Sequence, residues 1–296
     1  MKSRIDLHIH TTCSDGSLSP REVIDEAARL EVNCIAIADH DTVESYQEEL
    51  IQYAHEKGIK LIPAVEISTK IKKCGIHVLG YNVDVKNPKL LKELNYLRNA
   101  RQIYLKQVTK KLEELGYQVD IDYLSKLETV TKAHIAKDII TKEENKSQLE
   151  LVFGYLPNQG EFIETIMNEG CPAYVEKKTI TPKEAANLIR EAGGKVILAH
   201  PVSYGYEDNL SPQDILGIIQ EIQADGIESN YIYIDRNQQR IDESSFWNQF
   251  AASHHLKTTI GSDFHCKDNL HPEIGLIHDI HLSETEINNI LDFLDK

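Results

Sequence analysis

The 296-residue sequence contains no long hydrophobic run. No stretch approaches the roughly 18 consecutive apolar residues that a membrane-spanning helix requires. The first residues, MKSRIDLHIH, also lack the apolar segment of a secretory signal peptide. These absences predict a protein that does not cross a membrane and that works in the cytoplasm.

Cysteines are few, odd in number and widely spaced, at positions 13, 34, 74, 171 and 266. No two of them stand in a CxxC spacing, which argues against a disulfide framework and against a structural zinc site made of thiolates. We therefore expect each cysteine to be an unbridged thiol that contributes to packing.

Positive charge is also scarce, because 32 Lys and Arg residues are set against 47 Asp and Glu residues and the net charge is −15. Proteins that bind long nucleic acids neutralise many phosphates with Lys and Arg, so this composition argues against such a surface. A small phosphorylated ligand held at a local cationic site remains compatible with it. The sequence indicates no protein partner and no oligomeric state.

Short apolar runs rich in β-branched residues alternate with helical patterns over most of the chain. Seven of these runs are expected to be strands: 5–10, 34–38, 60–65, 76–81, 196–199, 226–229 and 257–260. Helices are expected to start near residues 19, 43, 181, 211 and 283, and a long polar helix is expected after 229. Alternation on this scale predicts an α/β barrel or a doubly wound sheet.

Residues 87–170 interrupt the alternation, because they show helical periodicity and no convincing strand. Leu90, Leu94 and Leu97, for example, recur at the spacing of one helix face. We interpret residues 1–100 and 173–296 as two parts of one barrel. Residues 101–172 are expected to form a helical insertion that acts as a cap for the substrate.

Histidines and acidic residues follow the expected strands one after another. They are His8, His10 and Asp15 at the first strand, His40 after the second, Glu66 after the third, His77 in the fourth, His200 after the fifth, and Asp263 and His265 after the last. Strand ends converge on one rim of a β/α barrel, where such folds build their active sites. Imidazole and carboxylate groups without thiolate suit zinc, manganese and iron.

His8 and His10 are two residues apart on a strand, so both side chains point to the same face and one ion can take both. Three divalent ions bound by three carboxylates would leave a local charge of roughly +3. Such a charge inside an acidic protein favours phosphate. Metal ions about 3.5–4 Å apart can also share a hydroxide and hold both the attacking and the departing oxygen.

The sequence resembles the polymerase-and-histidinol-phosphatase (PHP) family of metal-dependent phosphoesterases through six motifs, in the order DLHIHTTCSDG, IADHDT, PAVEIS, IHVLGY, LAHP and GSDFH. The segments TKAHIAKDII, GCPAYV and TPKEAANLIREAGGKVILAHP are similar to one subgroup of this family. That subgroup carries a helical insertion and hydrolyses nucleoside 3′,5′-bisphosphates and short RNA 5′ ends. The resemblance implies a distorted, TIM-like β/α barrel of seven strands.

The resemblance also implies how the strand-end residues are divided among three ions, with Glu66 bridging the first two. The ligand sets are, in turn, His8, His10, Glu66 and Asp263; Glu66, His77 and His200; and Asp15, His40 and His265. We expect two or three divalent transition-metal ions, namely manganese, iron or zinc.

Basic side chains of the insertion are the expected contacts for a second phosphate of the substrate. They are Arg98, Arg101, Lys132 and His134. The similar subgroup often has Arg where this chain has Lys132, and Lys cannot form the bidentate contact that Arg makes with phosphate. For Arg98 the alternative is a solvated position on a helix face.

The resulting hypothesis is a hydrolase that acts on a phosphate ester of a small nucleotide or on short RNA, through a metal-bridging hydroxide that attacks phosphorus in line. His40, His200 and Asp263 are the expected catalytic residues. His200 and Asp263 would act as ligands, and His40 or a metal-bound water would serve the leaving oxygen. Two alternatives stay open: a phosphatase or cyclic phosphodiesterase for histidinol phosphate or a cyclic sugar phosphate, and a non-catalytic metal-binding module.

Overall fold

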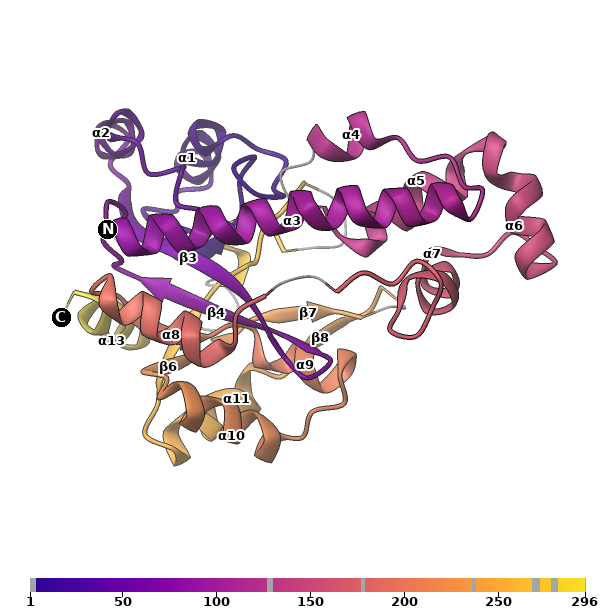
Figure 1. Cartoon of the computed structure of the whole chain (residues 1–296). Helices are drawn as coiled ribbons and strands as arrows, with labels where there is room; N and C mark the ends of the chain where they lie inside the picture. Colours follow the sequence, from indigo (N-terminus) through magenta and orange to yellow (C-terminus); the bar gives the residue numbers. More distant parts are fainter. Residues whose placement is uncertain are drawn as a thin grey trace. The chain divides into compact units, whose positions relative to one another are not determined.

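A computed structural model describes residues 4–126, 130–176, 179–235, 238–267, 272–277 and 282–295. The chain divides into two compact units (Figure 1). Met1–Asn95 and Ile180–Lys296 form the first unit, and Tyr96–Thr179 form the second. The second unit includes the whole of the predicted insertion.

A mixed seven-stranded sheet forms the centre of the first unit. Its strands, in spatial order, are β1 (Ile5–Ile9), β2 (Cys34–Ile37), β3 (Lys60–Ile71), β4 (Cys74–Tyr81), β5 (Lys195–Leu198), β6 (Gly226–Asn230) and β9 (Lys257–Ile260). Strand β4 runs antiparallel to both neighbours, and the other neighbouring strands pair in parallel.

The sheet nearly closes on itself between β1 and the segment that follows β9. Ile9 forms a parallel bridge with Phe264, and the backbone N–H of His10 donates to the Phe264 carbonyl oxygen at 2.9 Å. This near-closure confirms the predicted distorted barrel of seven strands. All seven predicted strands are present.

The strands form because their short apolar runs bury a shared core. One buried cluster joins residues of six strands of the sheet to α13 (Glu284–Leu294) and includes Ile5, Leu7, Ala36, Ile62, Leu79, Ile197, Ile260, Ile287 and Ile290. Burial of a Leu or Ile side chain contributes roughly 1.5–3 kcal/mol. The core therefore fixes the strands firmly, and their polar ends are held in place with them.

Seven helices lie wholly within the described residues of the first unit. They are α1 (Pro20–Arg29), α2 (Glu48–Glu56), α8 (Pro182–Glu191), α9 (Pro201–Glu207), α10 (Pro212–Ile222), α11 (Ser244–Ser253) and α13. Capping boxes start α1, α8, α10 and α13, and in each the first side chain accepts the N–H of the residue three positions later. The predicted helix starts at residues 19, 181, 211 and 283 are therefore confirmed.

Two predictions about local structure were wrong. The segment after β6 forms a hairpin of β7 (Ile232–Ile234) and β8 (Arg240–Asp242) before α11 begins, rather than one long polar helix. Its apolar, β-branched run suits a strand better than a helix. Helix α2 starts at Glu48 instead of near residue 43, because Tyr46 is buried and its hydroxyl donates to backbone oxygens of Ile37 or Ile62 at 2.7 Å.

In the part of the chain that the structure describes, the regular elements of the second unit are all helices. Its elements are the C-terminal part of α3 (Pro88–Glu114), α4 (Ile121–Lys126), α5 (Lys132–Thr141), η1 (Glu143–Asn145), α6 (Lys146–Phe153), α7 (Gln159–Phe162) and the π-helical η2 (Ile163–Met167). They enclose a core of their own, which includes Val108, Leu112, Leu124, Ile135, Ile139, Leu149 and Phe162.

The five cysteines are unbridged, as expected. Among the described helices, none combines the length and the apolar character that a membrane span needs.

Candidate metal centre

The nine predicted ligands reach one end of the barrel from strand ends and from the loops that follow them. Strand β3 is longer than expected, so Glu66 lies within it rather than after it, and His77 lies within β4. Eight of the nine fall into three overlapping groups with mutually close ligand atoms. The ninth, His200, places its Nε2 atom 3.2 Å from Glu66 Oε1.

The first group brings together His8, His10, Glu66 and Asp263. His10 Nε2 lies 3.0 Å from His8 Nε2, 3.3 Å from Glu66 Oε2 and 3.0 Å from Asp263 Oδ1. His8 Nε2 lies 3.3 Å from the same Glu66 oxygen and 3.4 Å from the same Asp263 oxygen. Four ligand atoms thus surround one point.

These separations match those of a metal site. Ligand atoms about 2.0–2.1 Å from a tetrahedral zinc ion lie about 3.3–3.4 Å from one another. The five distances of the first group span 3.0–3.4 Å. The donor set, two imidazoles and two carboxylates, is also one that zinc, manganese and iron accept.

Glu66 reaches a second set of neighbours through its other oxygen. Glu66 Oε1 lies 3.1 Å from His77 Nδ1 and 3.2 Å from His200 Nε2, and these two nitrogen atoms are 3.2 Å apart. His200 Nδ1 lies 2.9 Å from the Ser203 hydroxyl, which leaves Nε2 to face Glu66. Glu66 is therefore placed between two groups of nitrogen ligands.

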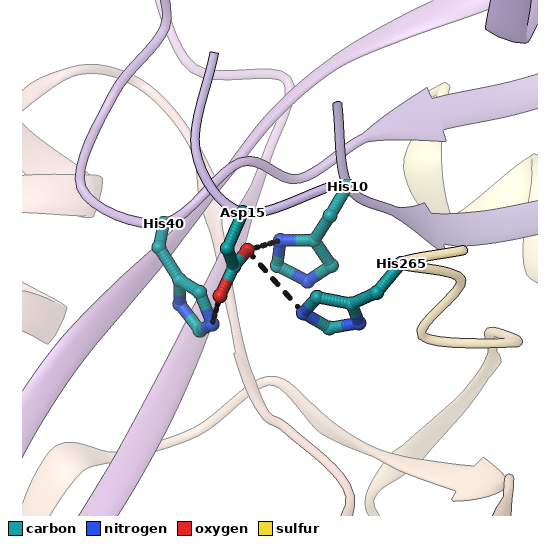
Figure 2. A group of neighbouring side chains, drawn as sticks. All are labelled: His10, Asp15, His40 and His265. Atoms are coloured by element: carbon teal, nitrogen blue, oxygen red, sulfur yellow. Dashed lines mark ion pairs between the residues drawn. The ribbon is translucent and has the colours of Figure 1, made fainter. Parts of the chain in front are cut away.

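Asp15 lies among three imidazole rings (Figure 2). Asp15 Oδ1 is 3.3 Å from His265 Nε2 and 3.4 Å from His10 Nδ1, and Asp15 Oδ2 is 3.8 Å from His40 Nε2. The other nitrogen of the His40 ring lies 3.0 Å from Glu66 Oε2, so His40 stands between the two carboxylates.

Several buried polar atoms of the cluster have no hydrogen-bond partner. Eight buried side-chain atoms of the described residues have no hydrogen bond, and three of them are here: Asp15 Oδ1, His40 Nδ1 and Glu66 Oε2. Nitrogen and oxygen atoms lie close by, yet without hydrogen-bond geometry. Buried polar atoms without partners are costly, and cations bound within the cluster would satisfy them. The residues therefore fit metal ions.

Burial is graded across the cluster. The side chains of His8, His10 and Glu66 are at most 1% exposed, whereas those of His77 and His265 are 31% and 34% exposed. The first three form the floor of the site. The last two form the side from which a ligand can approach.

The electrostatics keep two carboxylates ionised and His40 neutral, whereas nearby carboxylates outweigh burial at His8, His10 and His200 and raise the pKa of each ring. Burial would raise the pKa of Glu66, but the imidazoles of His40 and His8 outweigh it and hold that pKa well below its ordinary value. The pKa of Asp263 is low in the same way, because His8 and His265 outweigh burial. Burial lowers the pKa of His40 well below its usual range. Ionised carboxylates and neutral imidazoles are the forms that ligate metal ions.

The backbone is strained at two of these residues. His200 has φ 23° and Asp263 has φ 53°, in a region that residues other than Gly rarely adopt. Each such conformation costs on the order of 1–3 kcal/mol and persists only where its surroundings hold it. Strain of this kind clusters at functional sites.

Sequence reasoning missed two residues that contact the cluster. Glu228 accepts from His8 Nδ1 at 3.0 Å, and the Tyr231 hydroxyl donates to Asp263 Oδ2 at 3.3 Å. A charged residue within the short buried strand β6 was a visible signal for Glu228. Nothing in the sequence singled out Tyr231.

Asp39 and Asp41 lie outside the three groups and fix loops instead. Asp39 accepts the backbone N–H of Thr11 at 2.7 Å and the hydroxyl of Ser14 at 2.7 Å. Asp41 accepts the backbone N–H of Ser68 at 2.8 Å. Thr11 and Ser14 belong to the turn that carries Asp15, so Asp39 supports the site indirectly.

The predicted substrate contacts all belong to the second unit. Arg98 is half-buried on α3, and the side chain of Arg101 lies outside the described residues. Lys132 Nζ donates to Asn168 Oδ1 at 2.8 Å. The His134 ring takes part in the capping box of α5, where its Nδ1 accepts the Thr131 N–H at 3.3 Å.

A family model for the PHP domain matches residues 6–196. The chain belongs to the PHP family. A 5′-3′ exoribonuclease of Haemophilus influenzae is 32% identical over 270 residues, which cover 90% of this chain and 91% of that protein. A 3′,5′-nucleoside bisphosphate phosphatase of Chromobacterium violaceum is 27% identical, with coverage of 94% and 93%.

The PHP fold is also found in a solved structure from Bifidobacterium adolescentis, a presumed metal-dependent phosphoesterase. It superposes with a TM-score of 0.71 at 23% identity and covers 99% of this chain and 96% of that one. These findings confirm the family inferred from the six motifs. They also confirm the predicted enzyme class, a metal-dependent phosphoric ester hydrolase.

Proposed function

We propose that this PHP enzyme removes a phosphate from a small nucleotide, with a nucleoside 3′,5′-bisphosphate or the 5′ end of a short RNA as its substrate. The observation that carries the proposal is the buried cluster of imidazoles and carboxylates that contains three unpartnered polar atoms. The substrate class is supported by the two relatives, which are named for these two activities.

Three ions are proposed, with Glu66 shared by the first two. Their ligands are His8, His10, Glu66 and Asp263; Glu66, His77 and His200; and Asp15, His40 and His265. Manganese, iron and zinc all suit this donor set. When bound, such ions neutralise phosphate charge and lower the pKa of water.

The chain's own residues would position the substrate and hold the charges in place. The buried side chains of His8, His10 and Glu66 keep bulk water from the floor of the site. His200 and Asp263 are proposed to act as ligands on either side of Glu66. His40 faces both Glu66 and Asp15, and it is proposed to lie beside the leaving oxygen as a neutral ring whose pKa burial holds low.

The second unit is proposed to select the substrate. Arg98, Arg101, Lys132 and His134 are the candidate contacts for a second phosphate. Lys132 is held by Asn168, so its ammonium group has a defined position on α5. Because Lys contacts phosphate as a point charge, we expect weaker discrimination of a bisphosphate from a monophosphate than an Arg would give.

The test is release of inorganic phosphate from adenosine 3′,5′-bisphosphate by metal-loaded protein. The wild type should be active, and the double variant His8→Ala, Asp263→Ala should lose activity by a factor of at least about 1,000, because it removes half of the first ligand group. A matched control replaces the exposed residues of the same types, His55→Ala and Asp292→Ala, and should leave activity unchanged.

Substrates of other classes separate the alternatives. Faster turnover of histidinol phosphate or of a cyclic sugar phosphate would contradict the nucleotide assignment. Metal-loaded protein that hydrolyses no phosphoester would indicate a metal-binding module instead. Activity that survives in the His8→Ala, Asp263→Ala variant would show that the cluster is not the catalyst.

A further inference from the structure

Glu228 is a buried carboxylate in the middle of β6, only 1% exposed. Its Oε1 and Oε2 atoms lie 3.0 Å and 3.2 Å from His8 Nδ1. Oε2 also accepts the backbone N–H of His200 at 2.9 Å. One acidic side chain therefore contacts two of the proposed metal ligands, which come from different strands.

The contact with His8 determines which ring nitrogen faces the cluster. A neutral imidazole carries one N–H, and a carboxylate at Nδ1 holds that hydrogen there. His8 Nε2 then presents a lone pair to the point shared with His10 Nε2 at 3.0 Å and Asp263 Oδ1 at 3.4 Å. The other tautomer would place a hydrogen where the ion is expected.

The contact with His200 supports a strained backbone. His200 has φ 23° and ψ 61°, and its N–H is satisfied by Glu228 rather than by a neighbouring strand. The Ser203 hydroxyl lies 2.9 Å from Nδ1 of the same ring. Glu228 and Ser203 together direct His200 Nε2 toward Glu66 Oε1.

The strand next to β6 leaves space for Glu228. Gly261 follows β9, and a Cβ atom at this position would overlap both Glu228 Oε1 and the Cβ atom of His8. Gly261 does not have a positive φ, so it is space rather than backbone conformation that requires glycine here. Strands β1 and β6 and the residue after β9 therefore all contribute to the contact between Glu228 and His8.

We propose that Glu228 is a positioning residue that holds His8 and His200 in the form that binds metal, and so links the first two ion sites. The proposal rests on the proposed function, because it takes the cluster to be a metal centre. Glu228 touches none of the proposed ions. It acts through His8 and His200, so its replacement should lower the affinity for metal.

The test replaces Glu228 by its isostere in Glu228→Gln. In this variant the amide NH2 group would take the place of one carboxylate oxygen, and both carboxylate oxygens lie near His8 Nδ1. An N–H donor there favours the tautomer of His8 that has its hydrogen on Nε2, the nitrogen that faces the cluster. Metal affinity, measured by competition with a chelator and by elemental analysis, should fall 10- to 100-fold, as when outer partners of ligating histidines are removed elsewhere. The ion-free variant should keep the circular dichroism spectrum of the wild type.

The neighbouring residue of the same strand provides a matched control. Ser229 is equally buried, and its hydroxyl donates to Asn248 Oδ1 at 2.7 Å on α11 rather than to the cluster. Ser229→Ala removes a buried hydrogen bond from β6 and should leave metal affinity within about twofold. Glu228→Asp, which keeps the carboxylate but shortens its reach, should give an intermediate loss.

The outcomes separate this proposal from the proposed function. Wild-type affinity in Glu228→Gln would overturn the positioning role even if the enzyme hydrolyses nucleotides. An equal loss in Ser229→Ala would show that the effect is structural. Wild-type protein that binds metal but hydrolyses no phosphoester would contradict the proposed function and leave the role of Glu228 to be decided by the affinities. Wild-type protein that takes up no metal would overturn both.

Discussion

Glu66 presents its two carboxylate oxygens to different neighbours, and this division organises the cluster around it. Oε2 faces the Nε2 atoms of His8 and His10 at 3.3 Å each, whereas Oε1 faces His77 and His200. A carboxylate can join two ions through separate oxygens. The low pKa of Glu66 keeps both oxygens available for this purpose.

Without ions, the same cluster binds protons. Burial disfavours a charged imidazole at His10, but the neighbouring carboxylates of Asp263 and Glu66 outweigh it and raise the pKa of His10 from 6.5 to about 10. A raised pKa means that the protonated ring stabilises the folded state fully below about pH 6.5 and loses this effect as the pH rises toward 10. Ion-free protein should therefore become less stable between pH 7 and pH 10.

Thermal unfolding in the presence of a chelator measures this pH dependence. The wild type should lose more stability across the interval than His10→Gln, which has no titrating ring at this position. The exposed variant His55→Ala should behave like the wild type. If the stability of the wild type and of His10→Gln changed equally with pH, deprotonation of His10 would not be the cause of the pH dependence. Metal-loaded protein should show a smaller effect, because the ion replaces the proton.

The sequence was sufficient to predict which histidines and acids lie together, but not the residues that support them. His8, His200 and Asp263 stand at strand ends, and strand ends can be recognised from short apolar runs. Glu228 and Tyr231 act through partners distant in the chain, and no local pattern indicates such contacts. The strained backbone of His200 likewise depends on the tertiary structure around it.

At the scale of secondary-structure elements, apolar runs located the strands because each is buried in the core. The apolar runs did not predict how far a strand continues beyond the core. Strands β3 and β4 continue as an antiparallel pair to Ile71 and Cys74, through polar residues that hydrophobicity does not identify. Capping boxes located helix starts more accurately, because they depend on side chains only three residues apart.

The capping box of α8 offers a direct test at this scale. Thr181 Oγ1 accepts the Glu184 N–H at 3.3 Å, and the Glu184 carboxylate accepts the Thr181 N–H at 2.8 Å. Thr181→Ala should lower the free energy of unfolding by about 1 kcal/mol and the melting temperature by about 2 °C. Thr181→Ser should keep most of the stability. Calorimetry that finds no difference between the two variants would contradict this role of the cap.

At the scale of the whole molecule, a net charge of −15 coexists with a site proposed to attract phosphate. The two are compatible because charge acts locally: the three proposed ions would outweigh their three carboxylate ligands by roughly +3. The ions of the barrel would provide this charge. Both units have cores of their own.

The central claim is that one buried cluster of histidines and acids holds transition-metal ions. Elemental analysis of protein that has been stripped and then reconstituted with manganese, iron or zinc tests it most directly. We predict two to three tightly bound ions per chain and the loss of most of them in the His8→Ala, Asp263→Ala variant. A wild-type protein that retains no ion after reconstitution would contradict it.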